Sequence, residues 1–421
     1  MAQMTEMTAV RSAARPRLVY LANLRVPSEK AHVLQTFKNC EAFSTLGLEV
    51  ELAHPRRRGA RAIEGAGDPF DYYGVRERFS IREVPCPDLL SRPLPWGLQH
   101  AAFLLHSALF TGRALRGEDL SRPEVLLYTR DFFVATFLSL SGYRFLFEAH
   151  TLPRGPVGPW MRWLAEHSLG LVVITRELAR ELSRLGVPAD RILTAPDAVD
   201  ERWLEEPIER RDARRALDIP ESQQLATYAG HLYAWKGIDT VLDAAARLPG
   251  VRFHIVGGTV PDVERARTRV RELGLANVRL EGHVAPGRVP TYLAAADVLL
   301  LPNSGRVPIS ARHTSPLKAF EYMAAGRPIV ASDLPSLREI FENERSALLV
   351  TPDDGEQLAR GIERLLEDRV MAERLAGEGR RRVRSHTWRR RAEAIHGFAL
   401  KRGAWSRVSS HEAEAVAGAE L

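Results

Sequence analysis

Residues 315–332 read S-P-L-K-A-F-E-Y-M-A-A-G-R-P-I-V-A-S, and this stretch decides the type of fold. Ser315 is a residue type that caps helix N-termini, and Pro316 suits the first helical position, where no backbone N–H is needed. Gly326 suits the left-handed residue just past a helix end. A short apolar run at 328–331 follows at once. The stretch therefore predicts a helix between Ser315 and Gly326 followed by a buried strand, as in an α/β fold.

The N-terminus of this helix is a candidate anion site. A helix begins with free backbone N–H groups and the positive end of its dipole, and Lys318 adds a charge in the first turn. Glu321 follows one turn later, where it can accept hydrogen bonds from hydroxyl groups of the molecule that carries the anion. A capped helix before a strand is also ordinary α/β architecture without a ligand, so the assignment depends on the rest of the chain.

Length and composition indicate a globular protein of several domains. A chain of 421 residues exceeds one ordinary core and suggests roughly two or three domains. Apolar residues make up 45% and charged residues 27%, which is typical of soluble proteins. The net charge of +6 suits a polyanionic ligand or an anionic membrane surface. Nucleic acid is disfavoured because we find no helix-turn-helix, zinc-finger spacing or aromatic-basic RNA motif.

The cysteines and the chain ends bear on the compartment. Cys40 and Cys86 make neither a disulfide framework nor a metal pair, which indicates a reducing environment. Residues 1–16 lack the apolar core of a signal peptide, and no window approaches the roughly 18 apolar residues of a membrane span. We therefore expect a cytoplasmic protein with no metal site and with flexible tails at 1–16 and 406–421.

Lysine is rare in this chain. Of the 59 basic residues only five are lysines, at positions 30, 38, 236, 318 and 401. Where arginine supplies nearly all surface cations, a retained lysine favours a place that needs a compact, flexible ammonium group. This gives modest support to Lys236 and Lys318 as functional residues.

Alternating strands and helices divide the chain into two halves. In the first, residues 17–200, apolar runs predict strands at 17–23, 48–53, 124–128, 144–148, 171–174 and 191–195, with helices that include 28–46. In the second, residues 201–385, strands are expected at 225–230, 251–257, 278–280, 298–301, 328–332 and 347–350. This alternation predicts two doubly wound parallel sheets. Ligands of such sheets bind beyond the carboxyl ends of the strands, which places the site in a cleft between the domains.

Two further segments could contact a surface. Residues 96–115 predict an amphipathic helix with four leucines on one side, for which we expect packing into the core and keep membrane contact as the alternative: Leu98, Leu105, Leu109 and Leu115. Residues 55–71 are rich in arginine and glycine and predict a solvated loop, although the run R-R-R-G-A-R could also touch phosphate or lipid headgroups.

The second half opens with Y-A-G-H-L-Y-A-W-K-G-I-D-T at 228–240. A strand that ends at Gly230, followed by a loop and a helix that starts near Lys236, puts His231 and Lys236 at the mouth of the cleft. Both side chains can then face an anion on the helix at 315. A lone histidine in this position would more often be structural, but the pair with Lys236 favours anion binding.

These motifs resemble those of the retaining glycosyltransferases of family 4, which have the GT-B architecture of two Rossmann-like domains facing across a cleft. The similar segments occur in the family's order along nearly the whole chain: F-E-A-H-T at 147–151, V-V-I-T-R-E-L at 172–178, P-D-A-V-D at 196–200, G-H-L-Y-A-W-K-G at 230–237, A-D-V-L-L-L-P at 296–302, and the stretch at 315–332. The resemblance also implies that the last helix, 386–405, returns to the first domain.

The resemblance implies a UDP- or GDP-sugar donor bound mostly by the second domain, a hydroxyl acceptor bound mostly by the first, and no cofactor. Lys236 matches the residue that binds the donor diphosphate, and Glu321 matches the second acid of a Glu-x7-Glu motif, which binds the ribose. His150 matches the histidine that reaches the donor sugar near its reacting carbon. The expected catalytic residues are His150, His231 and Lys236, and the expected donor-binding residues are Gly230, Lys236, His313, Ser315, Pro316, Leu317, Lys318 and Glu321.

Four features depart from the family pattern. His313 stands where an acid should hold the donor sugar, and His231 stands where arginine usually accompanies Lys236. Pro316 replaces a common glycine, and the loop at 23–30 lacks the usual paired glycines. These differences concern the choice of sugar and acceptor more than the fold.

Several functions remain open at this point. The acceptor could belong to envelope glycan, glycolipid or natural-product synthesis. The arginine runs at 380–384 and 389–391 could rest on anionic lipid at the inner face of the cell membrane, or could simply be solvated. A nucleotide-sugar epimerase or hydrolase would need extra carboxylates in the cleft. A non-catalytic sugar-nucleotide-binding subunit would suit the loss of the acid at His313.

Overall fold

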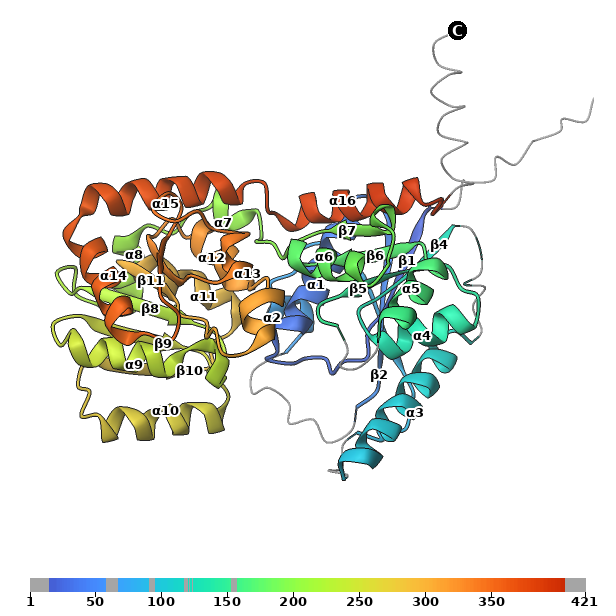
Figure 1. The fold of residues 1–421 in the computed structure, drawn as a ribbon, viewed down its shortest axis with the longest axis horizontal. Helices are drawn as coiled ribbons and strands as arrows, with labels where there is room; N and C mark the ends of the chain where they lie inside the picture. The colour runs from blue at the N-terminus through green and yellow to red at the C-terminus, as the bar shows by residue number, and fades with distance from the viewer. Residues whose placement is uncertain are drawn as a thin grey trace, which may run out of the picture.

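The computed structural model describes residues 15–57, 67–90, 95–116, 120, 122, 124–152 and 157–405. The expected tails, 1–16 and 406–421, and the arginine-rich part of the loop at 55–71 lie almost wholly outside these residues. Figure 1 shows two lobes side by side, one formed by the N-terminal half of the chain and one by the C-terminal half.

The first domain is built on a seven-stranded parallel sheet in the order β3-β2-β1-β4-β5-β6-β7. Its strands are β1 (Arg17–Leu21), β2 (Glu49–Pro55), β3 (Ser80–Val84), β4 (Val125–Thr129), β5 (Phe145–Ala149), β6 (Gly170–Val173) and β7 (Ile192–Thr194). The helices between them are α1 (Ala31–Thr45), α2 (Pro69–Tyr73), α3 (Trp96–Ala114), α4 (Phe132–Leu140), α5 (Gly158–Glu166), α6 (Arg176–Arg184) and the 3₁₀ turn η1 (Ala189–Arg191). One apolar cluster joins the sheet to α1, and another joins it to α3–α6.

The second domain has a six-stranded parallel sheet in the order β10-β9-β8-β11-β12-β13. Its strands are β8 (Leu225–Ala229), β9 (Arg252–Val256), β10 (Val278–Gly282), β11 (Val298–Leu301), β12 (Ile329–Ser332) and β13 (Leu348–Val350). Its helices and turns are α7 (Arg202–Glu205), α8 (Arg210–Ala216), η2 (Ala234–Lys236), α9 (Ile238–Arg247), α10 (Val260–Glu272), η3 (Pro286–Arg288), α11 (Val289–Ala295), η4 (Ile309–His313), α12 (Leu317–Ala324), α13 (Pro335–Arg338), α14 (Gly355–Glu367) and α15 (Arg369–Val383). The prediction of two doubly wound parallel sheets is confirmed.

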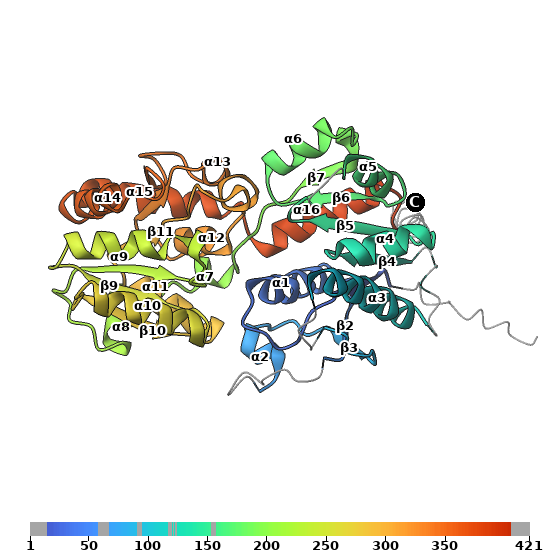
Figure 2. The same cartoon turned by 60° about the horizontal axis from the view of Figure 1, so that its bottom comes forward.

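Two chain crossings connect the domains and run side by side. The Val199 N–H donates to the carbonyl of His386 at 3.0 Å, and the Trp388 N–H donates to the carbonyl of Val199 at 3.2 Å. After the second crossing, α16 (Trp388–Lys401) packs on α1, and its apolar side chains join the core of the first domain. Figures 1 and 2 show this helix in red along the first domain.

The strand order explains where a ligand can bind. In each sheet the order reverses beside the first strand, between β1 and β4 and between β8 and β11. Crevices for ligands form at such switch points, beyond the carboxyl ends of the strands. The segments that follow these four strands all contribute residues to one cavity between the domains. The two switch points therefore face each other across this cavity.

The capping prediction for Ser315 is wrong. Helix α12 begins at Leu317, its N-cap position is Pro316, and no side chain caps it. The Ser315 hydroxyl instead accepts a hydrogen bond from the backbone N–H of Asp197 at 3.0 Å, on the segment that links the domains. The Ser315 side chain therefore binds a residue distant in the sequence and does not cap the helix that follows it. The other end is as predicted, because Gly326 follows the helix with φ of +65°.

The leucine face predicted for residues 96–115 is only partly a core face. Phe110 and Ala114, in the second half of α3, are buried. In the first half Leu98 is 60% exposed and Leu105 is 54% exposed. The prediction that both leucines pack into the core is therefore wrong, because this end of α3 extends past the sheet it covers (Figure 1).

Candidate active site

A cavity of about 570 Å³ lies between the two domains. It collects all ten site residues predicted from the sequence, namely His150, Gly230, His231, Lys236, His313, Ser315, Pro316, Leu317, Lys318 and Glu321. Only His150 belongs to the first domain, and the other nine come from the loops after β8 and β11 and from α12. The geometry shows what these groups can bind, while their individual roles remain predictions.

The uncapped N-terminus of α12 opens on this cavity with an unusual lysine. Lys318 is 7% exposed, and its Nζ has no hydrogen-bond partner among the described residues. The ammonium lies 4.0 Å from the centre of the Tyr228 ring, which offers only a cation–π contact. Burial lowers the pKa of Lys318 well below its usual value, and Lys236 lowers it further. A buried ammonium group without a hydrogen-bond partner is unfavourable, so this position suits an anionic ligand.

Gly230 lies beside the Lys318 side chain and leaves space for it because glycine has no Cβ atom. Its φ of +144° is a conformation that residues with side chains rarely adopt. A Cβ atom at this position would lie 2.9 Å from Nζ and 3.1 Å from Cε of Lys318. The glycine at the end of β8 therefore admits the lysine of α12, a contact between segments far apart in the sequence.

Lys236 supplies a second ammonium group to the cavity. It ends the 3₁₀ turn η2, and its Nζ lies 3.8 Å from the centre of the Trp235 ring. Burial lowers the pKa of Lys236 to about 7, although Asp197 acts to raise it. Burial likewise raises the pKa of the Asp197 carboxyl to about 7. The pKa values of Lys236 and Asp197 therefore both lie close to 7.

Glu321 lies one turn into α12, as the sequence predicts, and lines the cavity. Burial raises the pKa of its carboxyl to about 7, and Lys318 opposes this rise. A carboxylate in this position can accept two hydrogen bonds from neighbouring hydroxyl groups, the pattern that a ribose 2′,3′-diol presents.

His231 and His313 both line the second-domain wall of the cavity. The His231 ring stacks on Tyr233, with ring centres 5.0 Å apart, and burial lowers the pKa of His231. His313 ends the π-helical turn η4, and its Nε2 lies 3.0 Å from a carboxylate oxygen of Glu181 on α6 of the first domain. An acid is therefore present beside position 313, but the other domain supplies it.

His150 directly follows β5 on the first-domain wall. Its Nε2 lies 2.6 Å from a carboxylate oxygen of Glu148, and burial lowers the pKa of His150 to about 4, with Arg130 lowering it further. Arg130 and Asp197 are among the cavity residues that sequence reasoning missed. Arg130 is the first residue after β4, so the rule that ligands bind at the carboxyl ends of strands could have found it.

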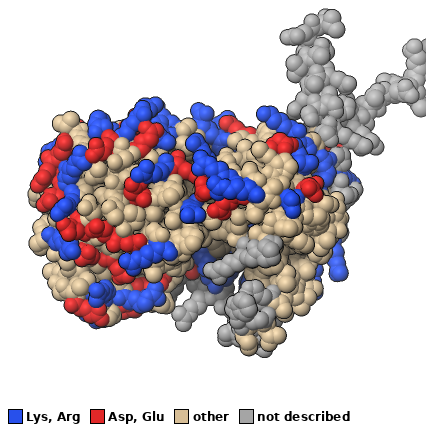
Figure 3. Space-filling view, in the orientation of Figure 1, with Lys and Arg blue, Asp and Glu red and all other residues tan. Residues whose placement is uncertain are grey.

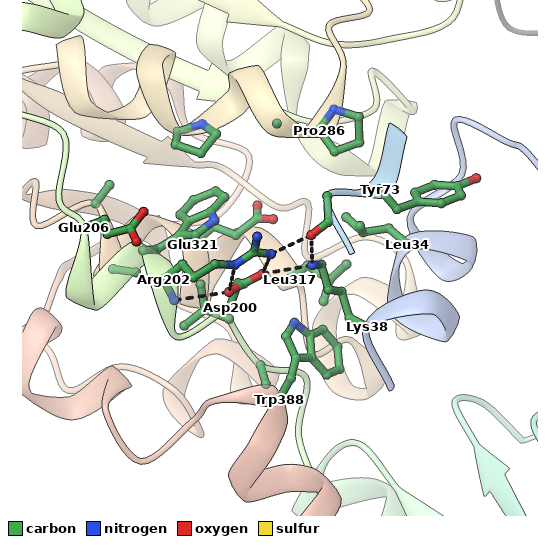
Figure 4. A pocket seen from close by; sticks show the side chains of 18 of the residues that line it. Leu34, Lys38, Tyr73, Asp200, Arg202, Glu206, Pro286, Leu317, Glu321 and Trp388 are labelled. Atoms are coloured by element: carbon green, nitrogen blue, oxygen red, sulfur yellow. Dashed lines mark hydrogen bonds and ion pairs between the residues drawn. The ribbon is translucent and has the colours of Figure 1, made fainter. Parts of the chain in front are cut away.

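A smaller cavity of about 330 Å³ adjoins the first and shares Leu317 and Glu321 with it. Figure 4 shows Lys38 and Arg202 converging there on Asp200. The Lys38 Nζ lies 2.9 Å from Asp200 Oδ2 and 2.7 Å from the carbonyl of Gly74, and Arg202 Nη2 donates to the same carbonyl at 2.6 Å. These cations already have partners, in contrast to Lys318. They hold the domains together and do not require a ligand.

Comparisons with known proteins agree with this architecture. Residues 209–382 match the sequence model of the family described as glycosyl transferases group 1. The chain is 32% identical over 241 residues to D-inositol 3-phosphate glycosyltransferase of Acidothermus cellulolyticus, which covers 54% of this chain and 52% of the relative. It spans about half the length of the curated relatives it matches first.

Two solved structures are similar over almost their whole length. Sucrose-phosphate synthase from Thermosynechococcus elongatus has 20% identity and a TM-score of 0.70, covering 92% of this chain and 99% of that one. HepE of Anabaena, solved in complex with UDP and glucose, has 16% identity and a TM-score of 0.65, covering 96% of this chain and 100% of that one. This chain thus has the GT-B fold, and its second domain matches the group 1 glycosyltransferases in sequence.

Proposed function

We propose that this protein is a retaining glycosyltransferase of family 4 that moves a sugar from a UDP- or GDP-sugar to a hydroxyl acceptor without a metal ion. The observation that carries the proposal is the buried, unpaired ammonium of Lys318 beside the uncapped N-terminus of α12. Lys236 enters the same cavity, so a diphosphate there meets two cations and the positive end of a helix. The family match over residues 209–382 supports a donor-binding second domain.

The same groups suit the chemical step. Breaking the bond between sugar and phosphate adds negative charge to the diphosphate, and preorganised donors stabilise that charge. Loss of one such donor typically costs about 3 kcal/mol in the transition state. Lys318 supplies from α12 the charge that the family places on an arginine at position 231. A bound diphosphate also raises the pKa of His231, so we expect an imidazolium in the complex.

With the diphosphate at the N-terminus of α12, the contacts with the ribose and the sugar can be assigned as well. Glu321 binds the ribose, and His150 and His313 flank the sugar. The incoming hydroxyl group attacks from the face that the diphosphate leaves, which retains the configuration at the reacting carbon. A His231→Gln variant that loses the same fraction of activity at pH 6 and at pH 8.5 would contradict a cationic role for His231.

The first-domain wall favours an acceptor that carries an anionic group. Lys30, His32 and Arg130 line this side of the cavity, together with one acid, Glu29. The name of the Acidothermus relative identifies inositol 3-phosphate as its acceptor. We therefore propose a hydroxyl acceptor with a phosphate group, either a small molecule or a lipid-linked one. Transfer to inositol 3-phosphate but not to inositol would support this, and equal transfer to both would exclude it.

Peripheral membrane contact, if it occurs, is better assigned to α3 than to the arginine runs. Leu98, Leu104 and Leu105 leave an apolar surface on the first half of α3, whereas Arg381 and Arg389 form ion pairs with acids of their own helices. Figure 3 shows basic and acidic side chains interspersed on the face where α14 and α15 lie. No helix in the described part of the chain is long and apolar enough to cross a bilayer. Co-sedimentation with phosphatidylglycerol vesicles that a Leu98→Ser/Leu105→Ser variant abolishes would support contact through α3.

The experiment that tests the function is a panel of UDP- and GDP-sugars scored by thermal shift and by sugar transfer. A donor that binds only the folded protein raises the melting temperature. Release of free sugar or conversion to another sugar without an acceptor would point to a hydrolase or epimerase. Binding with neither turnover nor transfer would point to a non-catalytic sugar-nucleotide-binding subunit. No binding by any member of the panel would refute the donor site.

A further inference from the structure

The C-terminal helix places a buried arginine directly behind His150. Arg391 lies on α16, 243 residues from Glu148, and is 5% exposed. Its Nη2 donates to Glu148 Oε1 at 2.8 Å, its Nη1 to Asn39 Oδ1 at 2.6 Å, and its Nε to the carbonyl of Pro196 at 3.0 Å. One guanidinium group thus joins β5, α1 and the segment that crosses between the domains.

Glu148 is the residue on which these contacts converge. It is completely buried, it accepts hydrogen bonds from Tyr128, Gln35 and Arg391, and its Oε1 lies 2.6 Å from Nε2 of His150. Burial alone would raise the pKa of this carboxyl, but the charge of Arg391 and the hydrogen bond from His150 bring it below its usual value. Glu148 is therefore an ionised carboxylate that accepts hydrogen bonds.

The ionised Glu148 carboxylate determines which nitrogen of the His150 ring carries the proton. Glu148 Oε1 lies 2.6 Å from Nε2, a distance that requires an N–H between the two atoms. In the other tautomer, Nε2 would turn a lone pair towards the carboxylate and could accept only from Gln35 Nε2 at 3.5 Å. The hydrogen bond that one ring nitrogen makes sets the state of the other, so Nδ1 keeps the lone pair.

We propose that Arg391 and Glu148 are positioning residues, which hold the His150 ring as the Nε2–H tautomer so that Nδ1 offers a hydrogen-bond acceptor to a hydroxyl group of the donor sugar. The contact with the sugar rests on the proposed function, whereas the state of the ring does not. Arginine is required because three donors in a fixed fork reach three acceptors, which the single ammonium of lysine cannot do. The helix that returns to the first domain thereby takes part in building the site.

The state of His150 can be measured directly by NMR on the full chain labelled with ¹⁵N-histidine, with a His150→Gln variant to assign the signals. The wild-type protein should show a protonated Nε2 and an unprotonated Nδ1 from pH 8 down to pH 5.5. An Nδ1–H tautomer, or an imidazolium at pH 7, would overturn the proposal. This readout needs neither a donor nor catalytic activity, so it stands even if the proposed function fails.

An Arg391→Met variant tests the role of the arginine. The charge of Arg391 is one of those that lower the pKa of His150, so without it the His150 signals should titrate at a higher pH than in the wild type. Arg389→Met is the matched control, because Arg389 on the same helix forms an exposed ion pair with Glu393 and should leave the signals unchanged. If Arg391→Met left the titration of His150 in place, Arg391 would have a structural role only. If this variant fails to fold, the wild-type tautomer still decides the proposal.

The contact with the sugar has a separate readout. With the nucleotide sugar that gives the largest thermal shift, Arg391→Met should bind about tenfold more weakly, the loss expected for one hydrogen bond, while UDP or GDP alone should bind as in the wild type. Equal weakening of the nucleotide and the nucleotide sugar would overturn the assignment of His150 to the sugar.

Discussion

Replacement of Lys318 by methionine should shift stability and nucleotide binding in opposite directions. The ammonium is buried and has no hydrogen-bond partner among the described residues, so its desolvation penalty is not offset by a hydrogen bond. An unsatisfied buried donor costs roughly 1–3 kcal/mol, and a charged one costs more. Lys318→Met should therefore raise the free energy of unfolding at pH 7 by at least about 1 kcal/mol, which is roughly 2 °C in melting temperature for a protein of this size.

The same substitution should weaken binding of UDP and GDP. A hydrogen bond to a charged group contributes about 1.5–3 kcal/mol, which corresponds to roughly a ten- to hundredfold increase in Kd. Isothermal titration calorimetry with each nucleotide at pH 7 measures the change. A residue with only a structural role would lose stability and binding together, so the opposite signs distinguish a ligand-binding lysine from a core lysine.

The pH dependence of stability provides a further check. The pKa of Lys318 in the folded state lies well below its value of about 10.4 in the unfolded chain. Between these two values the unfolded chain binds more protons, so this lysine destabilises the fold increasingly as the pH falls through that window. The stability advantage of Lys318→Met should therefore be large at pH 7 and should shrink towards pH 10.

Two other lysines are matched controls. Lys38 is also buried, but it has Glu41, Asp200 and the carbonyl of Gly74 as partners, so Lys38→Met should lower stability by roughly 3 kcal/mol. Lys401, which is exposed on the last turn of α16, should change neither quantity when replaced by methionine. A Lys318→Met protein that melts no higher than the wild type, or that binds both nucleotides with unchanged affinity, would refute this account of the cavity.

Three further outcomes are expected. UDP or GDP binding should take up protons near neutral pH, because a phosphate anion raises the pKa of Lys236 from about 7; equal calorimetric heats in buffers of different ionisation enthalpy would contradict this. Gly230→Ala should weaken UDP binding at least about tenfold by pushing the Lys318 side chain aside, whereas Gly250→Ala, which meets open space, should not. Glu321→Gln should reduce the preference for UDP over 2′-deoxy-UDP, measured as the ratio of their Kd values; an unchanged ratio would place the ribose elsewhere.

Much of the fold could be predicted because buried strands and helix faces have apolar residues in recognisable patterns along the chain. Strands covered on both faces appear as continuous apolar runs, and both sheets were predicted from these runs together with the helices between them. The strand that was missed, β3, is an edge strand with only one buried residue, so its sequence lacks such a run. The cap predicted at Ser315 failed for a different reason, because Asp197 is a partner that no local pattern reveals.

The sequence by itself determined the two sheets, the order of their motifs and the residue types that converge on the cleft. It also indicated that the rare lysines have special positions, and the structure places Lys30, Lys236 and Lys318 on the larger cavity and Lys38 on the smaller one. Only the tertiary structure decided which of these charges are paired. A buried charge finds its partner where segments distant in the sequence converge, as Arg391 of α16 meets Glu148 of β5. Apolar periodicity is a property of neighbours in the chain, whereas the pairing of buried charges is a property of neighbours in space.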